Sequence, residues 1–214
     1  MTLVFDTSDP VQRERGLGAA MSAVRRGELV VLPTDTVYGI GADAFTPLAV
    51  DRLLSTKGRG RDMPVPVLVA SPDMASALVV ELGEAGSALV ERFWPGPLTV
   101  VARHTPHLLW DLGDSRGTVA VRMPDHEVAV SLIAETGPLA VSSANRTGSS
   151  PAVTVAEAQE QLGDDVAVYL DGGPCASSTP STIVDLTGDR PRILREGALT
   201  LSRLRDVLPD LGEE

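Results

Sequence analysis

The apolar residues of this chain occur in two alternating patterns, short unbroken runs and longer stretches with helical spacing. Continuous runs rich in valine, leucine and isoleucine predict strands buried on both faces of a sheet. The predicted strands are Leu29–Pro33, Pro64–Ala70, Leu98–Ala102, Thr118–Arg122, Leu139–Ser142, Val166–Leu170, Thr182–Leu186 and Arg192–Leu194. Strands and helices that alternate in this way indicate a layered α/β domain.

Four predicted helices begin at residues that cap helix N-termini. Asp9, Thr46 and Ser71 each precede a proline, and Thr154 precedes a fourth stretch with helical spacing. A capping oxygen followed by proline at the first helical position is a strong start signal.

The helix that begins at Pro47 is expected to end at Gly58, which places Lys57 and Arg59 where the helix meets a loop. Lys57 is the one lysine of the chain, beside seventeen arginines, and it lies in the run Ser55–Arg61. Cations flanked by glycines are typical of a loop that binds phosphate or carboxylate. On its own, the lysine is more simply explained as a solvated surface residue, and only its context favours a site.

Length and charge narrow the choice of protein class. A chain of 214 residues is long enough for one well-buried domain, and a net charge of −11 argues against non-specific coating of nucleic acid. We expect one domain over residues 1–210 and a frayed tail over 211–214. The chain has no apolar run of membrane-spanning length and no signal-peptide pattern, so we expect a cytoplasmic protein without membrane association. A single cysteine, Cys175, is consistent with a reducing compartment.

Several common catalytic motifs are absent from the sequence. It has neither the P-loop nor the Gly-x-Gly-x-x-Gly pattern, and Gly-x-Ser-x-Gly is missing too. The three histidines have no cysteine or carboxylate cluster at metal-ligand spacing, so we predict no protein-bound metal. Cys175 has no neighbouring base in the sequence and is expected to be an inert thiol.

Hydroxyl and amide side chains gather instead where predicted strands end. Pro33–Gly41 offers two threonines and two glycines that would let the backbone approach a ligand, although a turn that bonds to itself explains it equally well. Ser143 and Asn145 share a face if their strand continues. On its own, the cluster Ser177–Thr182 is most simply explained as a polar loop. Arg195 alone is most simply explained as part of a surface ion pair.

Seven segments, taken in order, resemble the threonylcarbamoyl-AMP synthases of the YrdC-like family. The segments are Pro33–Gly41, Lys57–Arg59, Phe93–Thr99, Thr118–Pro124, Ser143–Asn145, Ser181–Asp185 and Arg195–Gly197. They extend over nearly the whole chain, and their shared order carries the resemblance.

The resemblance implies an open, twisted, mixed β-sheet with helices packed on it and a large concave pocket. It also implies a reaction in which L-threonine, bicarbonate and ATP give threonylcarbamoyl-AMP, diphosphate and water, the first step of N6-threonylcarbamoyladenosine formation in tRNA. Lys57 and Arg59 would be the catalytic residues. The implied threonine ligands are Thr36, Arg122, Ser143 and Ser181. The implied ATP ligands are Arg59, Thr118, Asn145, Val153 and Arg195.

The resemblance also implies partners. Mg²⁺ would arrive with the ATP phosphates and not on a protein site. The product would pass to a tRNA threonylcarbamoyl transferase complex, and direct contact with tRNA is the weakest of these expectations. A non-catalytic YrdC-like paralogue that binds nucleotide or RNA is the alternative.

Some positions depart from the family pattern. Gly60 stands where the family usually has proline, and Met63-Pro64-Val65 stands where Asn-Pro-Leu is common. Leu68 occupies a position where some members have histidine near threonine, and Val153 offers ATP only its main chain. We expect replacement of Lys57 by alanine to abolish adenylate formation and to leave the fold intact, since a lysine at a helix end contributes little to stability.

Overall fold

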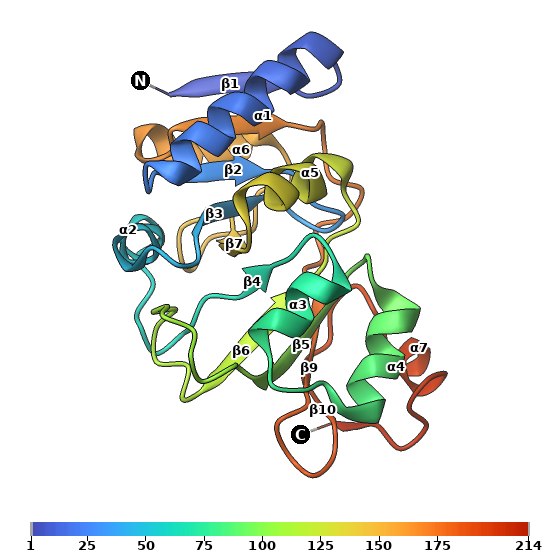
Figure 1. Ribbon diagram of the computed structural model, residues 1–214. Coiled ribbons are helices and arrows are strands. Elements are labelled where there is room, and N and C mark those ends of the chain that lie inside the picture. The colour runs from blue at the N-terminus through green and yellow to red at the C-terminus, as the bar shows by residue number, and fades with distance from the viewer. Residues whose placement is uncertain (1, 214) are drawn as a thin grey trace.

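One mixed β-sheet runs through the computed structural model, which describes residues 2–213 (Figure 1). Within those residues the sheet has eleven strands in the order β1-β8-β2-β3-β7-β4-β6-β5-β9-β10-β11. The strands are β1 (Leu3–Asp6), β2 (Val30–Leu32), β3 (Gly39–Asp43), β4 (Val67–Leu68), β5 (Leu98–Arg103), β6 (Thr118–Arg122), β7 (Leu139–Ser143), β8 (Val168–Asp171), β9 (Thr182–Asp185), β10 (Arg192–Arg195) and β11 (Gly212–Glu213).

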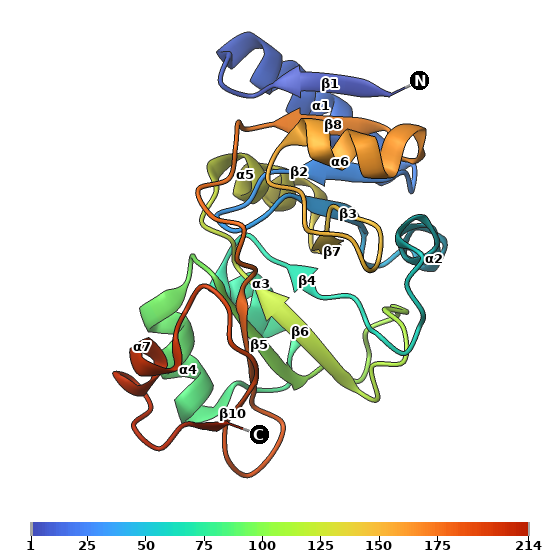
Figure 2. The ribbon, with the colours of Figure 1, turned by 180° about the vertical axis from the view of Figure 1, so that it is seen from behind.

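Helices cover this sheet and connect its strands. They are α1 (Pro10–Arg25), α2 (Pro47–Lys57), α3 (Pro72–Leu78), α4 (Gly83–Phe93), α5 (Glu127–Thr136), α6 (Val155–Leu162), the short 3-10 helix η1 (Gly163–Asp165) and α7 (Leu201–Arg205). α1 and α5 lie side by side on one face of the half that contains β8 and β2, and α6 covers the opposite face (Figures 1 and 2).

The sheet is strongly twisted. In Figure 1, β1, β8 and β2 run across the view, whereas β6 and β5 run steeply through it. The two halves join where β7 pairs antiparallel with β4, and the pairing there covers only two residues of β4. The open twisted α/β fold expected from the sequence is therefore confirmed.

Burial on both faces of the sheet explains the continuous apolar runs. In β2, Val30 and Leu32 pack with α1 and α5, whereas Val31 packs into a second cluster on the other face with Tyr38 and Ile40. Successive side chains of a strand point to opposite faces, so each face needs its own apolar set.

The predicted helix starts at Asp9, Ser71 and Thr154 are confirmed, since each side chain accepts a hydrogen bond from the main chain of its helix. α2 begins after Thr46 as predicted, but the Thr46 hydroxyl donates to Asp43 Oδ2 (2.7 Å) and caps nothing.

Three helices, α4, α5 and α7, and three strands, β1, β3 and β11, were not predicted. α4 and α5 follow Leu82 and His126, neither of which makes a side-chain cap bond, so the usual start signal is missing. α7 is only five residues long. The short N-terminal run was not predicted to form β1. Pro33–Gly41 was interpreted as a segment that approaches a ligand or as a turn, yet Gly39–Asp43 forms β3, an interior strand of the sheet.

Order in the tail extends further than expected. Residues 211–214 were predicted to be frayed, but Gly212 and Glu213 pair with Arg192 and Ile193 as β11. Glu214 lies outside the described residues. The expectation of a single domain over residues 1–210 stays a prediction.

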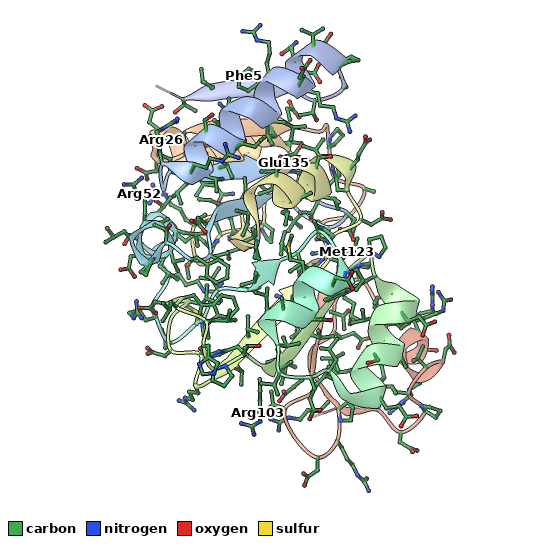
Figure 3. All side chains as sticks on the ribbon, in the orientation of Figure 1. Phe5, Arg26, Arg52, Arg103, Met123 and Glu135 are labelled. Atoms are coloured by element: carbon green, nitrogen blue, oxygen red, sulfur yellow. The ribbon has the colours of Figure 1, made fainter. Side chains whose placement is uncertain are left out.

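Two glycines in α1 provide a matched test of this packing. A Cβ on Gly16 would lie 2.8 Å from the Cβ of Phe5, the β1 side chain labelled in Figure 3, whereas a Cβ on Gly18 would meet nothing within 4 Å. We expect Gly18→Ala to raise the free energy of unfolding by about 0.5–1 kcal/mol through helix propensity. Gly16→Ala should lower it by about 1–3 kcal/mol because of overpacking. Urea denaturation of both variants checks this, and a gain in stability for Gly16→Ala would contradict the packing.

Candidate functional site

A cavity of about 310 Å³ lies between the two halves of the twisted sheet. Its walls come from the segment before β3, from β7 and the Arg59 loop, and from β5, β6, β9 and β10. Six predicted site residues line it. They are Thr36, Arg59, Arg122, Ser143, Ser181 and Arg195. Among the lining residues the only charged side chains are the three arginines, so the cavity is suited to anions.

A larger depression, of about 610 Å³, lies elsewhere, between α1, α2 and η1. Arg26 and Arg52, both labelled in Figure 3, are among the residues that line it. Arg26 pairs there with Glu28 (2.6 Å), and none of the predicted site residues lines it. The smaller, basic cavity is therefore the candidate site.

Arg122 is the most firmly held cation in the cavity. Its Nε donates to Gly96 O (3.0 Å), its Nη1 to Thr36 Oγ1 (2.9 Å) and its Nη2 to Asp35 Oδ1 (2.5 Å). A guanidinium has five N–H groups, so two remain, one on each terminal nitrogen. Burial lowers the pKa of Arg122, and Asp35 opposes that shift. The group is charged and pre-oriented to grip a carboxylate.

The expected ligand Thr36 is part of this arrangement. Thr34 Oγ1 donates to Val37 O (2.7 Å), so the hydrogen between Thr34 Oγ1 and Thr36 Oγ1 (3.1 Å) belongs to Thr36. The Thr36 hydroxyl accepts from Arg122 and donates to Thr34. Only one acceptor position on it stays open for a ligand.

The turn that contains Gly96 also supports Arg122. A Cβ on Gly96 would lie 2.6 Å from Phe93 O, so a larger residue does not fit there. The Trp94 indole donates to Leu98 O (2.7 Å), and Gly96 N donates to Met123 O (2.9 Å). These bonds fix the carbonyl that receives Arg122 Nε.

Lys57 lies at the end of α2, where Gly58 adopts the left-handed conformation expected of a helix C-cap (φ 62°). Its side chain is only 3% exposed. The ammonium donates to Ser143 O (2.6 Å) and Asn145 O (2.6 Å), and it has no carboxylate partner among the described residues. The interpretation of Lys57 as a solvated surface residue is therefore wrong. That replacement of Lys57 leaves the fold intact stays a prediction.

Burial lowers the pKa of Lys57 to about 8, and the positive charge of Arg59 acts in the same direction. Desolvation without an ion pair has this effect on an amine. Lys57 does not itself line the cavity, but it holds the end of β7 from which Ser143 enters it. The Ser143 hydroxyl has no hydrogen-bond partner among the described residues.

The run from Lys57 to Arg61 is not one basic patch. Arg59 turns into the cavity and donates to Ser142 Oγ (3.2 Å) and to the carbonyls of Met63 and Pro64. Arg61 points the other way, where it pairs with Asp111 (2.5 Å) and Asp51 (3.0 Å). Only the first arginine keeps its charge available to a ligand.

Arg195 stands at the mouth of the cavity with its side chain partly exposed. It donates to Ser181 O (2.8 Å), and the Ser181 hydroxyl is bonded to Thr99 (2.8 Å). Partial burial lowers the pKa of Arg195, and the charges of Arg122 and Arg59 lower it further. Gly197 permits this contact, since a Cβ there would lie 2.3 Å from Pro180 O.

Three predicted ATP ligands lie away from the cavity lining and already have protein partners. Thr118 Oγ1 donates to Ser115 O (2.7 Å), and Val153 N donates to Glu157 Oε2 (2.7 Å). The Asn145 amide donates to Arg146 O and Ser149 O, so it holds the following loop, while its buried Oδ1 has no partner. The expectation that Ser143 and Asn145 share one face fails because β7 ends at Ser143.

Gly39 lines the cavity and Gly41 does not, and both glycines also accommodate a neighbouring side chain within the sheet. A Cβ on Gly39 would lie 2.6 Å from Val141 Cγ1, and one on Gly41 would lie 3.2 Å from Val141 Cγ2. These glycines make room for a β7 side chain within the sheet.

The sequence reasoning missed several residues that build the site. Asp35 holds Arg122, Thr99 holds Ser181, and Ser142 receives Arg59. Asp35 lies between the two threonines of the Pro33–Gly41 segment, so the signal was present, but an aspartate in a turn usually bonds to its own main chain.

Within the described residues, no group of three or more His, Cys, Asp or Glu side chains is arranged to hold a metal ion. No helix in the described part of the chain has the length and apolar character needed to cross a membrane.

Comparisons with known proteins identify the family of this chain. The Sua5/YciO/YrdC family model, described as "Telomere recombination", matches residues 22–197. A relative from Mycobacterium tuberculosis, named "Putative threonylcarbamoyl-AMP synthase", is 55% identical over 97% of this chain and 96% of its own length. The threonylcarbamoyl-AMP synthase of Bacillus subtilis is 36% identical over 95% of this chain and 58% of its own length.

A solved structure is also closely similar. Sua5 from P. abyssi, crystallised with L-threonine, superposes with a TM-score of 0.91 at 33% identity and covers 100% of this chain and 62% of its own. The match to the family model contains all seven segments and ends at Gly197, the last residue of the seventh. The chain belongs to the Sua5/YciO/YrdC family.

Proposed function

We propose that this protein is a threonylcarbamoyl-AMP synthase, which makes threonylcarbamoyl-AMP from L-threonine, bicarbonate and ATP and so begins N6-threonylcarbamoyladenosine formation in tRNA. The observation that carries the proposal is the cavity in which Arg59, Arg122 and Arg195 gather without a lining carboxylate. Full-length relatives that bear this name support it.

The chemistry matches the available groups. The amine of threonine combines with bicarbonate to give a carbamate and water, and a carbamate oxygen then attacks the α-phosphorus of ATP as diphosphate leaves. No step needs a side-chain nucleophile. The protein has to hold two anions together, neutralise developing charge and exclude water from a labile carbamate.

The residues divide by the kind of anion that they suit. The two free N–H groups of Arg122 suit the threonine carboxylate, with Thr36, Ser143 and Ser181 around it. Arg59 and Arg195, which have no carboxylate partner among the described residues, suit the phosphates. Lys57 completes the positive field between them.

Contact of ATP with Thr118, Asn145 or Val153 stays a prediction. Each would have to release or share a protein hydrogen bond, apart from the free Oδ1 of Asn145, which is an open acceptor. Mg·ATP as the nucleotide substrate, transfer of the product to a tRNA threonylcarbamoyl transferase complex and a cytoplasmic location likewise remain proposals.

The alternative, a non-catalytic paralogue that binds nucleotide or RNA, is less well supported. Such a paralogue would not need a group that binds an amino-acid carboxylate beside the arginines that suit phosphate, whereas Arg122 is oriented to bind one. Relatives from two bacterial groups carry the synthase name.

Diphosphate release tests the proposal directly. We expect the purified protein to release diphosphate from ATP only when both L-threonine and bicarbonate are present, because the carbamate is the nucleophile. Omission of either substrate is the control. Release that ignores threonine would refute the synthase and favour a simple nucleotide hydrolase.

Replacement of Lys57 by methionine should affect both activity and stability. We expect threonine-dependent diphosphate release to fall at least about 100-fold. The free energy of unfolding should fall by about 1–3 kcal/mol, since two carbonyls lose their donor. Arg52→Met, on the exposed side of the same helix, is the control and should retain activity. Unchanged stability in Lys57→Met would show that the clamp on β7 is dispensable.

The lowered pKa of Lys57 predicts a pH dependence. As the pH rises through about 8, the ammonium loses its proton, so the affinity for ATP should fall. Above that pH the unfolded chain binds more protons at this residue, so its contribution to folding stability should rise with pH. Calorimetric titration with ATP from pH 6.5 to 9.5 measures the affinity. Lys57→Arg should be insensitive over this range, and the same decline in that variant would assign the effect to another group.

A further inference from the structure

We propose that Asp35 is a positioning residue that reserves Arg122 for the carboxylate of the amino acid and keeps phosphate groups away from it. The inference rests on the proposed function, because it concerns how one cavity distributes two different anions. It concerns a residue outside the predicted ligand set.

Asp35 is held against Arg122 from two directions. Its Oδ1 accepts from Arg122 Nη2 (2.5 Å) and from the main-chain N of Asp125 (3.0 Å). The two side chains are 14% and 8% exposed. A buried pair of this kind orients the guanidinium and leaves two of its N–H groups directed elsewhere.

Hydrogen bonding to Arg122 does not by itself explain why residue 35 is a carboxylate. Its second oxygen, Oδ2, is buried and has no hydrogen-bond partner among the described residues, and the same holds for Nδ1 of the nearby His126. Buried polar atoms without partners are rare and costly. A neutral side chain could also accept a hydrogen bond from Arg122, but it would leave the buried guanidinium without a counter-charge, so the negative charge is the property that sets Asp35 apart.

The charge separates the three arginines into two kinds. Asp35 neutralises Arg122, whereas Arg59 and Arg195 bind only carbonyls and hydroxyls of the protein. Phosphate carries about two negative charges near neutral pH, whereas threonine is a zwitterion with no net charge. A negative charge beside Arg122 therefore repels phosphate more than threonine, and it directs the polyphosphate to the other two arginines.

The wild-type protein offers the first test. Inorganic phosphate, used as the probe, should weaken ATP binding competitively and leave the affinity for L-threonine unchanged, both measured by calorimetry. Competition between phosphate and threonine in the wild type would overturn the proposal. This result does not depend on any variant that has to fold.

Asp35→Asn provides the second test. The asparagine oxygen still accepts from Arg122 and Asp125 N, but the charge is gone. We expect phosphate to become a competitor of threonine, with the ratio of the phosphate to the threonine dissociation constant reduced at least about fivefold. Asp189→Asn, which removes the same charge from an exposed loop, should leave the ratio unchanged. A folded Asp35→Asn protein with the wild-type ratio would reduce Asp35 to a purely structural role.

These binding measurements separate the two proposals. If threonine binds but diphosphate release does not require it, the synthase assignment fails while the competition pattern still tests Asp35. If catalysis is as proposed but phosphate competes with threonine in the wild type, only the role of Asp35 fails.

Discussion

Removal of water from positive charge is the constraint on which the site of this protein depends. Lys57 and Arg122 are buried and Arg59 is half-buried, and only Arg122 has a carboxylate beside it. A cation that loses its hydration must find other oxygens or lose its proton. Main-chain carbonyls supply most of them, from Gly96 for Arg122 and from Ser143 and Asn145 for Lys57. Except at Arg122, which is paired with Asp35, the positive charge is thus stabilised by neutral oxygens and not neutralised, which leaves the cavity attractive to anions.

The short motifs along the chain are largely supports for these cations. Thr36 and Asp35 hold Arg122 from one side, and the turn at Gly96 holds it from the other. Gly197 allows the chain to pass close to Pro180, beside the contact between Arg195 and Ser181. Several segments that the sequence suggested as substrate ligands therefore supply the residues that orient the cations of the cavity.

The twist of the sheet brings these supports together. β3 and β7 belong to one half and β6, β5 and β9 to the other, and the halves meet at the short pairing of β7 with β4. Because strand directions change across that junction, the two halves enclose a concave space instead of a flat surface. The cavity is lined from both sides, so neither half alone contains the site.

The sequence by itself determined the fold class, most strands and the start of four helices, and its resemblance to a family pointed to six of the residues that line the cavity. Continuous apolar runs and capping prolines are local signals, and they report local structure reliably. The sequence did not reveal β3, whose glycines make sense only once Val141 of β7 is placed over them. It also did not reveal α4 and α5, which begin without caps and are stabilised by packing.

Only the tertiary structure decided which cations stay available to a ligand. Arg59 and Arg61 are two residues apart, yet one faces the cavity and the other is paired with Asp51 and Asp111. The partner of Arg122 lies 87 positions away in the chain, at Asp35, and the carbonyl partners of Lys57 lie 86 and 88 positions away. Charge compensation depends on distances of a few ångströms between segments remote in sequence, and no local pattern encodes those distances.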